Sequence, residues 1–94
     1  MHLELTDKGF HLEGPLTFQH VRDIWNESQE SFDQFETLEV DLADVSHCDS
    51  AALALLIEWK RLAIQQNQSI VFQNLPVQLI KMAKMSGVER IFTN

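Results

Sequence analysis

The chain has 94 residues, of which 45% are hydrophobic, a size that supports one small core and leaves no room for a second domain. Seven basic and fourteen acidic residues give a net charge of -7, which argues against nucleic acid as a partner because phosphate binding needs clustered Lys and Arg. No apolar run reaches the roughly 18 residues of a membrane span. The longest run, residues 51–57, is followed closely by Glu58, Lys60 and Arg61. We therefore expect a single domain over residues 1–94.

The first residues and the single cysteine indicate the cellular compartment of the protein. Residues 1–7 alternate in character and include early acids, unlike the basic-then-apolar layout of a secretory signal. Cys48 is the only cysteine and cannot form an internal disulfide, which fits a reducing environment. We expect a cytoplasmic protein.

A hairpin is predicted at the N-terminus. Leu3 and Leu5 alternate with polar residues, residues 7–9 supply turn chemistry, and residues 10–13 alternate again. Gly and Pro at residues 14–15 are expected to end the second strand.

The next segment predicts an amphipathic helix, because its apolar residues recur at spacings of three and four. Thr17 is the expected N-cap, and the helix is expected to end between residues 29 and 32. The apolar stripe consists of Phe18, Val21, Ile24 and Trp25.

Two later segments predict strands. Leu38, Val40 and Leu42 point to one side within residues 37–42, and this strand is expected to be central. Residues 69–73 (Ser-Ile-Val-Phe-Gln) are apolar without alternation, as expected for a strand covered on both faces.

A last helix is predicted to start at Pro76 and to stop at Gly87. Residues 88–92 fit either a short edge strand or a turn of helix. The expected packed side of the helix consists of Val77, Ile80, Met82, Ala83 and Met85.

These elements predict an α/β fold. The strand at residues 37–42 reaches the strand at residues 69–73 through a helix, so a right-handed parallel crossover is expected. The predicted architecture is a four- or five-stranded, mostly parallel sheet with an N-terminal edge hairpin, packed against three or four helices.

Residues 40–57 indicate a buried strand, a short polar turn and a helix, a junction where small α/β domains place working residues. The apolar arc of the helix spans roughly 200°, about twice what a surface helix needs. Either the helix is central and covered on both sides, or Leu55, Leu62 and Trp59 form an exposed patch for another protein. The core side of the helix consists of Ala52, Leu53, Leu56, Trp59 and Ala63.

Ser50 begins this helix and has two interpretations. Its hydroxyl, like the carboxylate of Asp49, can cap an unpaired backbone N–H. Alternatively, it is an exposed hydroxyl that takes a phosphate at the positive end of the helix dipole or meets a donor of a partner.

Catalysis and metal binding are not expected. His47, Cys48 and Asp49 are adjacent, but a metal site needs several converging donors and the chain has no other cysteine. Neighbouring Cys and His side chains at a tight turn rarely reach each other as a catalytic pair. Because no glycine-rich phosphate loop, paired-carboxylate motif or triad spacing is present, we expect no enzyme, metal or cofactor.

The residues after this strand carry a resemblance. Residues 40–42 (Val-Asp-Leu) and 45–56 (Val-Ser-His-Cys-Asp-Ser-Ala-Ala-Leu-Ala-Leu-Leu) resemble the signature of the STAS domain, the fold of anti-sigma factor antagonists. The helix opening at residues 53–56 is most similar to MlaB-like members, which are small cytoplasmic subunits of phospholipid ABC transporters. Residues 80–88 also resemble the third helix of the family, so the resemblance covers essentially the whole chain.

The resemblance implies two functions. In the first, the chain is a non-enzymatic subunit that binds and stabilises or activates an MlaF-like ATPase. Through that ATPase it reaches the inner-membrane permease of a system that maintains outer-membrane lipid asymmetry. The partner-binding residues would be Ser50, Asp49, His47, Ala51, Leu53, Leu55 and Trp59.

The second implied function is an anti-sigma factor antagonist whose Ser50 is phosphorylated by a partner kinase. Ala51 and Ala52 stand where antagonists usually have a small residue and then Gly. The missing Gly weakens the expectation of a kinase-docked switch, because that Gly leaves the helix start unhindered.

Overall fold

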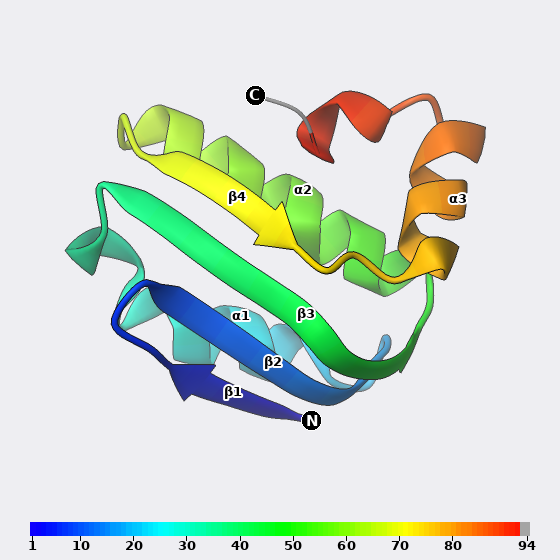
Figure 1. Ribbon diagram of the computed structural model, residues 1–94, viewed down its shortest axis with the longest axis horizontal. Helices are drawn as coiled ribbons and strands as arrows, with labels where there is room; N and C mark the ends of the chain where they lie inside the picture. The colour runs from blue at the N-terminus through cyan, green and yellow to red at the C-terminus, as the bar shows by residue number, and fades with distance from the viewer. Residues whose placement is uncertain (93–94) are drawn as a thin grey trace.

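The computed structural model describes residues 1–92 and has a four-stranded sheet in the order β1-β2-β3-β4 (Figure 1). β1 and β2 pair antiparallel, whereas β2 with β3 and β3 with β4 pair parallel. The predicted mixed sheet, edge hairpin and central third strand are therefore confirmed. The strand bounds are β1 His2–Leu5, β2 Gly9–Leu16, β3 Thr37–Cys48 and β4 Ser69–Gln73.

The second strand of the hairpin does not end at residues 14–15. It continues to Leu16, which pairs with Cys48, and its register with β3 passes over Pro15. The pairing with β1 ends at Glu13, so beyond that residue β2 has a neighbour on one side only. A proline is tolerated there because no ladder hydrogen bond from it is required.

The first two helices, α1 (Val21–Gln29) and α2 (Ser50–Gln65), lie on the same face of the sheet, behind it in Figure 1. The connections from β2 to β3 and from β3 to β4 both move to the next strand in the same direction across the sheet. Parallel crossovers are right-handed, so two crossovers in the same direction place their helices on the same face. No helix of the described residues covers the other face. The helices are α1 Val21–Gln29, α2 Ser50–Gln65 and α3 Val77–Met85, with 3-10 turns η1 Phe32–Gln34 and η2 Glu89–Phe92.

The first helix starts three residues later than predicted, because its N-cap is His20 and not Thr17. The carbonyl of Thr17 accepts from the backbone N–H groups of His20 and Val21, so residues 17–20 form a turn, and His20 takes the N-cap position. The Thr17 hydroxyl pairs with Nδ1 of His20 at 2.9 Å instead of capping the helix. Phe18 therefore precedes the helix and is 79% exposed.

The core fills the space between the sheet and the helices. Phe10, Leu38, Val40 and Trp59 are almost fully buried there, as the alternation in β3 and the core side of α2 predict. Trp59 donates from Nε1 to the hydroxyl of Ser28 at 3.0 Å, so the one fully buried polar side chain among the described residues is satisfied.

The third helix packs partly as predicted, since Ala83 is buried and Met82 is half-buried against the core. Leu79 and Ala83, one turn apart, are buried, while Val77 and Met85 are 66% and 88% exposed. Gly87 follows the helix with a φ of 73°, and it ends the helix as predicted. Residues 88–92 form a helical turn rather than a strand.

The third strand is twice as long as predicted. From Asp41 to Asp44, β3 advances by three residues while the paired part of β2 advances by two. The same difference recurs from Val45 to Cys48. Each irregularity adds one residue to β3, as a β-bulge does. The expected polar turn is thus mostly strand.

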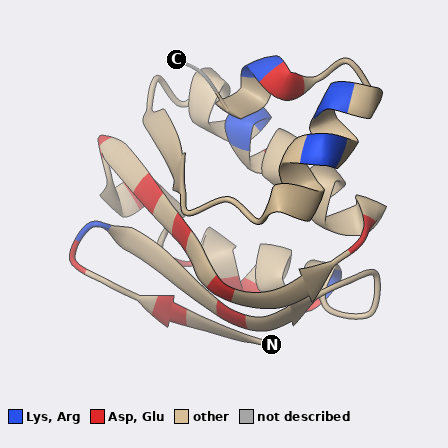
Figure 2. Ribbon diagram, turned by 45° about the vertical axis from the view of Figure 1, so that its right-hand side comes forward, with Lys and Arg blue, Asp and Glu red and all other residues tan. Residues whose placement is uncertain are grey.

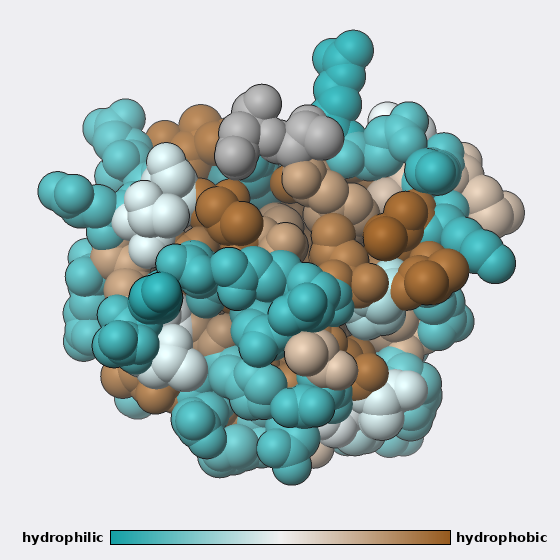
Figure 3. Space-filling model, in the orientation of Figure 1, coloured by the Kyte–Doolittle hydropathy of each residue, from teal (hydrophilic) through white to brown (hydrophobic). Residues whose placement is uncertain are grey.

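The strands β1, β2 and β3 carry acidic residues, and none of the four strands carries a Lys or Arg. Figure 2 shows Asp and Glu along the strands, whereas most Lys and Arg lie on α2, α3 and η2. The sheet face without helices is hydrophilic across its middle in Figure 3, and apolar groups gather around α3. β4 is therefore covered on one face only, contrary to expectation.

Among residues 1–92, none of the helices has the length and apolar character that a membrane crossing requires.

Candidate functional site

The junction between β3 and α2 is held by the carboxylate of Asp49. This residue separates the two elements and is the N-cap of α2, with Oδ1 accepting from the N–H of Ala51 at 2.9 Å. Its Oδ2 accepts from the N–H of Phe18 at 3.0 Å. These bonds keep the pKa of Asp49 below its ordinary value, with the Phe18 N–H as the largest cause.

Asp49 performs the capping, so Ser50 does not. Ser50 is the first residue of α2, its side chain is exposed, and its hydroxyl forms no hydrogen bond with any of residues 1–92. The alternative of Ser50 as a structural cap is thereby wrong. An exposed hydroxyl with free donor and acceptor capacity lies at the positive end of a 16-residue helix.

An apolar groove of about 780 Å³ runs between α1 and α2, beside this junction. Phe18, Val21 and Trp25 form one wall, and Ala51 and Leu55 contribute to the other. The α2 residues recur at intervals of three and four, so they share one face of the helix. The remaining lining residues are Ala54 and the polar rim of Gln19, Arg22, Asp23 and Glu58. We call this lining the α1–α2 groove.

Part of the predicted partner-binding surface is not accessible. Trp59 is fully buried and Leu53 is 6% exposed, because α2 packs against the sheet on one side and α1 and α3 on its flanks. The interpretation of α2 as a central, covered helix holds for these residues, and within residues 1–92 no exposed patch forms around Trp59. Leu55 is also buried, at 5% exposure, but it lines the α2 wall of the groove. Leu62 is half-buried.

The remaining predicted residues are neighbours of Ser50 in the sequence. His47 is exposed and its ring lies 3.5 Å from the Ser46 hydroxyl, while Ala51 is half-buried in the groove. Cys48 is buried, donates to Oε1 of Gln78 on α3 and has a pKa raised by burial. Its thiol is a packing group that ties α3 to this end of the sheet.

Sequence reasoning missed the α1 wall of the groove. Phe18 and Trp25 were assigned to the packed stripe of a helix, but the later start of α1 leaves Phe18 outside it. Phe18 lies inside the turn of residues 17–20, between Thr17 and Gln19, and these polar neighbours were the available signal for exposure.

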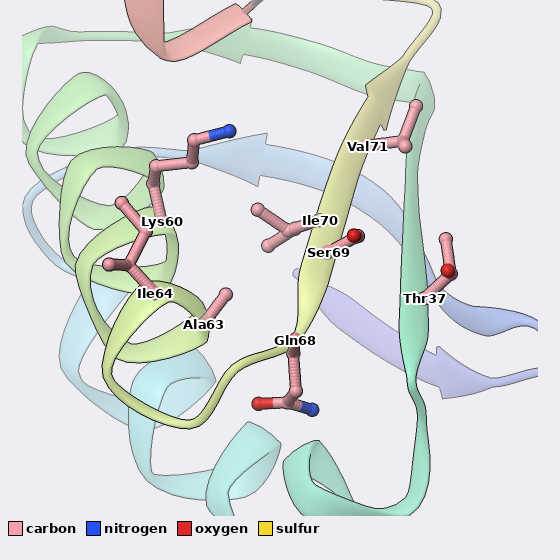
Figure 4. A pocket seen from close by; sticks show the side chains of 8 residues that line it. All are labelled: Thr37, Lys60, Ala63, Ile64, Gln68, Ser69, Ile70 and Val71. Carbon is pink, nitrogen blue, oxygen red and sulfur yellow. The ribbon is translucent and has the colours of Figure 1, made fainter. Parts of the chain in front are cut away.

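A second hollow, of about 510 Å³, lies between the C-terminal half of α2 and β4 (Figure 4). Lys60 approaches from α2, while Thr37 points away from it beyond β4, so the polar groups do not converge. Gln68 donates from Nε2 to the carbonyls of Phe32 and Phe35 at 2.7 and 2.8 Å, which is a structural role. The Ser50 end remains the stronger candidate.

Comparison with protein families decides what the chain is. The family described as "Mlab, STAS domain" matches residues 1–93. The chain belongs to the STAS domain family. The resemblance seen in the residues around Asp49 and Ser50 is therefore confirmed, and Ser50 of this STAS domain occupies the exposed start of the second helix.

Solved structures show the same fold at low sequence identity. "Structure of the Anti-Sigma Factor Antagonist SpoIIAA in its Unphosphorylated Form" superimposes with a TM-score of 0.73 at 19% identity, covering 94% of this STAS domain and 81% of that chain. "Crystal Structure Analysis of Mglu" gives a TM-score of 0.63 at 17% identity, covering 79% of this chain and 19% of that chain. No curated protein matches the sequence.

Proposed function

We propose that this STAS domain is a non-enzymatic accessory subunit that binds and stabilises or activates a cytoplasmic ATPase subunit of an ABC-type phospholipid transporter. Its place would be the cytoplasmic side of the inner membrane, reached through the ATPase and permease. The transporter would maintain outer-membrane lipid asymmetry. Membership of the MlaB-like STAS family supports this choice of partner.

The observation that carries the proposal is the unbonded Ser50 hydroxyl. Asp49 takes over the cap of α2 and leaves Ser50 exposed on a rigid helix start. A hydroxyl that is held in place but has no intramolecular partner is suited to a hydrogen bond across an interface.

The α1–α2 groove supplies the apolar part of the same surface. Phe18 is 79% exposed and begins the groove beside Asp49, to which its N–H is bonded. An interface combines a buried apolar centre with hydrogen bonds at its rim, and this arrangement is present at the Ser50 end of the fold. The partner would place an apolar side chain in the groove and a polar group at Ser50.

Co-purification with an MlaF-like ATPase from the same organism tests the proposal. Ser50→Glu should abolish capture, and Phe18→Asp should weaken it by about 30-fold, the effect of losing an interface anchor. Ser50→Ala, which removes only one neutral hydrogen bond, should weaken it by about tenfold or less.

Two matched controls separate docking from folding. Ser86→Glu and Met85→Asp place the same charges on exposed residues of the α3 end, outside the α1–α2 groove, and should leave capture unchanged. Circular dichroism checks that all four charged variants are folded. If folded Ser50→Glu and Phe18→Asp bind as well as the parent chain, the interface lies elsewhere.

The second candidate is an anti-sigma factor antagonist switched by phosphorylation of Ser50. The exposed, unbonded hydroxyl and the fold shared with an antagonist favour it. A phosphate there would gain from the helix dipole but would lie beside the Asp49 carboxylate. Mass spectrometry of the protein isolated from cells should find phosphate on Ser50, and its absence under all growth conditions would reject this candidate.

A further inference from the structure

The uncovered face of the sheet holds a histidine between two aspartates. Nδ1 of His11 lies 3.1 Å from Oδ2 of Asp41, and Nε2 lies 2.8 Å from Oδ2 of Asp44. His11 is on β2 and both aspartates are on β3. One imidazole ring therefore joins two neighbouring parallel strands through both of its nitrogens.

The bulge in β3 makes this arrangement possible. Side chains three residues apart on a regular strand point to opposite faces of the sheet. His11 pairs with Asp41 and Glu13 pairs with Asp44, so β3 has one more residue than β2 between these two pairs. The extra residue turns Asp44 toward the same face as Asp41, where both reach the ring.

Asp41 is itself fixed in place. Its Oδ1 accepts from the N–H of Ala43, inside the bulge, at 3.0 Å, and from Nδ2 of Asn74 at 2.9 Å. These bonds, with Asn74 the largest cause, lower the pKa of Asp41. The carboxylate is therefore an ionised acceptor that holds the bulge backbone and His11 together.

The geometry suits a charged ring. An ionised carboxylate only accepts hydrogen bonds, and only the imidazolium can offer a proton to Asp41 and to Asp44 at the same time. The pKa of His11 is raised, chiefly by the hydrogen bond to Asp41. Because the pKa of His11 is higher in the folded state, its charged ring stabilises the fold fully below the unfolded pKa of about 6.5. This stabilisation is lost as the pH rises through the folded pKa.

The surroundings add further negative charge. Glu4 on β1 pairs opposite His11, and Glu13 follows it on β2. A hollow on this face is lined by His11 and Asp41, and Lys8 is the one Lys or Arg among its lining residues. The helices α1 and α2 cover the opposite face (Figure 1). The other charged residues that line this hollow are Asp7 and Glu39.

We propose that His11 is a proton-dependent latch that holds the β3 bulge in register and thereby fixes the Asp49–Ser50 end of the strand. The second half of β3 continues directly from Asp44 to Cys48, and Asp49 follows. When His11 is neutral, one of its two aspartates is released, and the bulge loses a cross-strand tie. The consequence for docking rests on the proposed function; the latch itself does not.

Amide hydrogen exchange on the isolated domain tests the latch at pH 5.5 and 8.5. After correction for intrinsic exchange rates, protection of the amides of residues 42–46 should fall by about two- to fivefold at the higher pH, the factor that a partly exposed ion pair contributes. His11→Gln, which cannot be charged, should show the lower protection at both values. His11→Arg, which stays charged, should show the higher protection at both.

Two results would overturn the latch. One is equal protection of the parent chain and His11→Gln at pH 5.5. The other is an NMR titration midpoint of the His11 ring at or below that of exposed His2 in the same spectra. No ATPase is present in these measurements, so an incorrect partner assignment leaves their outcome unaffected.

Discussion

The backbone N–H of Phe18 donates a 3.0 Å hydrogen bond to Oδ2 of Asp49, and this bond joins the loop after β2 to the start of α2. The other carboxylate oxygen of Asp49 accepts from Ala51. One side chain thus caps the helix, holds the backbone of Phe18 and leaves the Ser50 hydroxyl without a hydrogen bond to any of residues 1–92. Three features of the candidate site depend on a residue that sequence reasoning treated as secondary to Ser50.

Replacing the cap should destabilise the fold. Asp49→Ala removes both hydrogen bonds and should lower the free energy of unfolding by about 1–2 kcal/mol, as loss of an N-cap does. Asp49→Asn retains an acceptor and should lose less. Urea denaturation measures both, with Glu27→Ala on the exposed side of α1 as a control. Equal stability of Asp49→Ala and the control would show that the cap contributes nothing.

The same carboxylate should make stability depend on acid. The pKa of Asp49 is lower when folded than the unfolded value of about 3.9. Its contribution is therefore present above about pH 4 and is lost as the pH falls through the folded pKa. The free-energy difference between the parent chain and Asp49→Asn should shrink in that range. A difference that stays constant from pH 6 to pH 2 would contradict this.

The buried pair of Trp59 and Ser28 should behave as a unit. Trp59 Nε1 donates to the Ser28 hydroxyl, which in turn donates to the carbonyl of Trp25 at 2.7 Å. Ser28→Ala leaves a buried indole N–H unpaired and should cost about 1–3 kcal/mol. Trp59→Phe should cost a similar amount, and the double variant should cost less than the sum. Strict additivity in a double-mutant cycle would show that the two side chains are not coupled.

Gly9 should tolerate no side chain. Its φ is 154°, and a Cβ built there would collide with the backbone of Glu39 on the neighbouring strand. Gly9→Ala should therefore lower the free energy of unfolding by more than about 2 kcal/mol. Gly87→Ala is the matched control, since Gly87 also has a positive φ, of 73°, but open space around it. Gly87→Ala should cost about 1–2 kcal/mol, the strain of the left-handed conformation alone. Equal losses in thermal denaturation would rule out the clash.

The sequence predicts the regular parts of the fold because their signals are local. The alternation of Leu38, Val40 and Leu42 and the apolar run of β4 identify strands that the structure confirms. The bulges of β3 carry no such signal. Residues 43–47 are polar enough for a turn, and only their pairing with β2 makes them strand. Register across strands is a tertiary property, so local patterns cannot provide it.

The candidate site was predicted in part for the same reason. Asp49 and Ser50 follow from the helix start and the family motif, which are contiguous in sequence. The α1–α2 groove depends on where α1 begins, and that is set by the turn at residues 17–20 and by Asp49, 31 residues after Phe18. The burial of Trp59 depends on Ser28, also 31 residues away. Long-range partners of this kind decide which apolar residues remain accessible.

The two tryptophans of this domain report on different events. Trp59 is fully enclosed in the core, whereas Trp25 lies half-buried in the wall of the α1–α2 groove. Fluorescence of Trp59 should therefore change when the domain unfolds, and fluorescence of Trp25 should change when the groove is filled. A Trp25→Phe variant leaves a spectroscopic signal for folding alone, and the difference from the parent chain gives a label-free signal for occupancy of the groove.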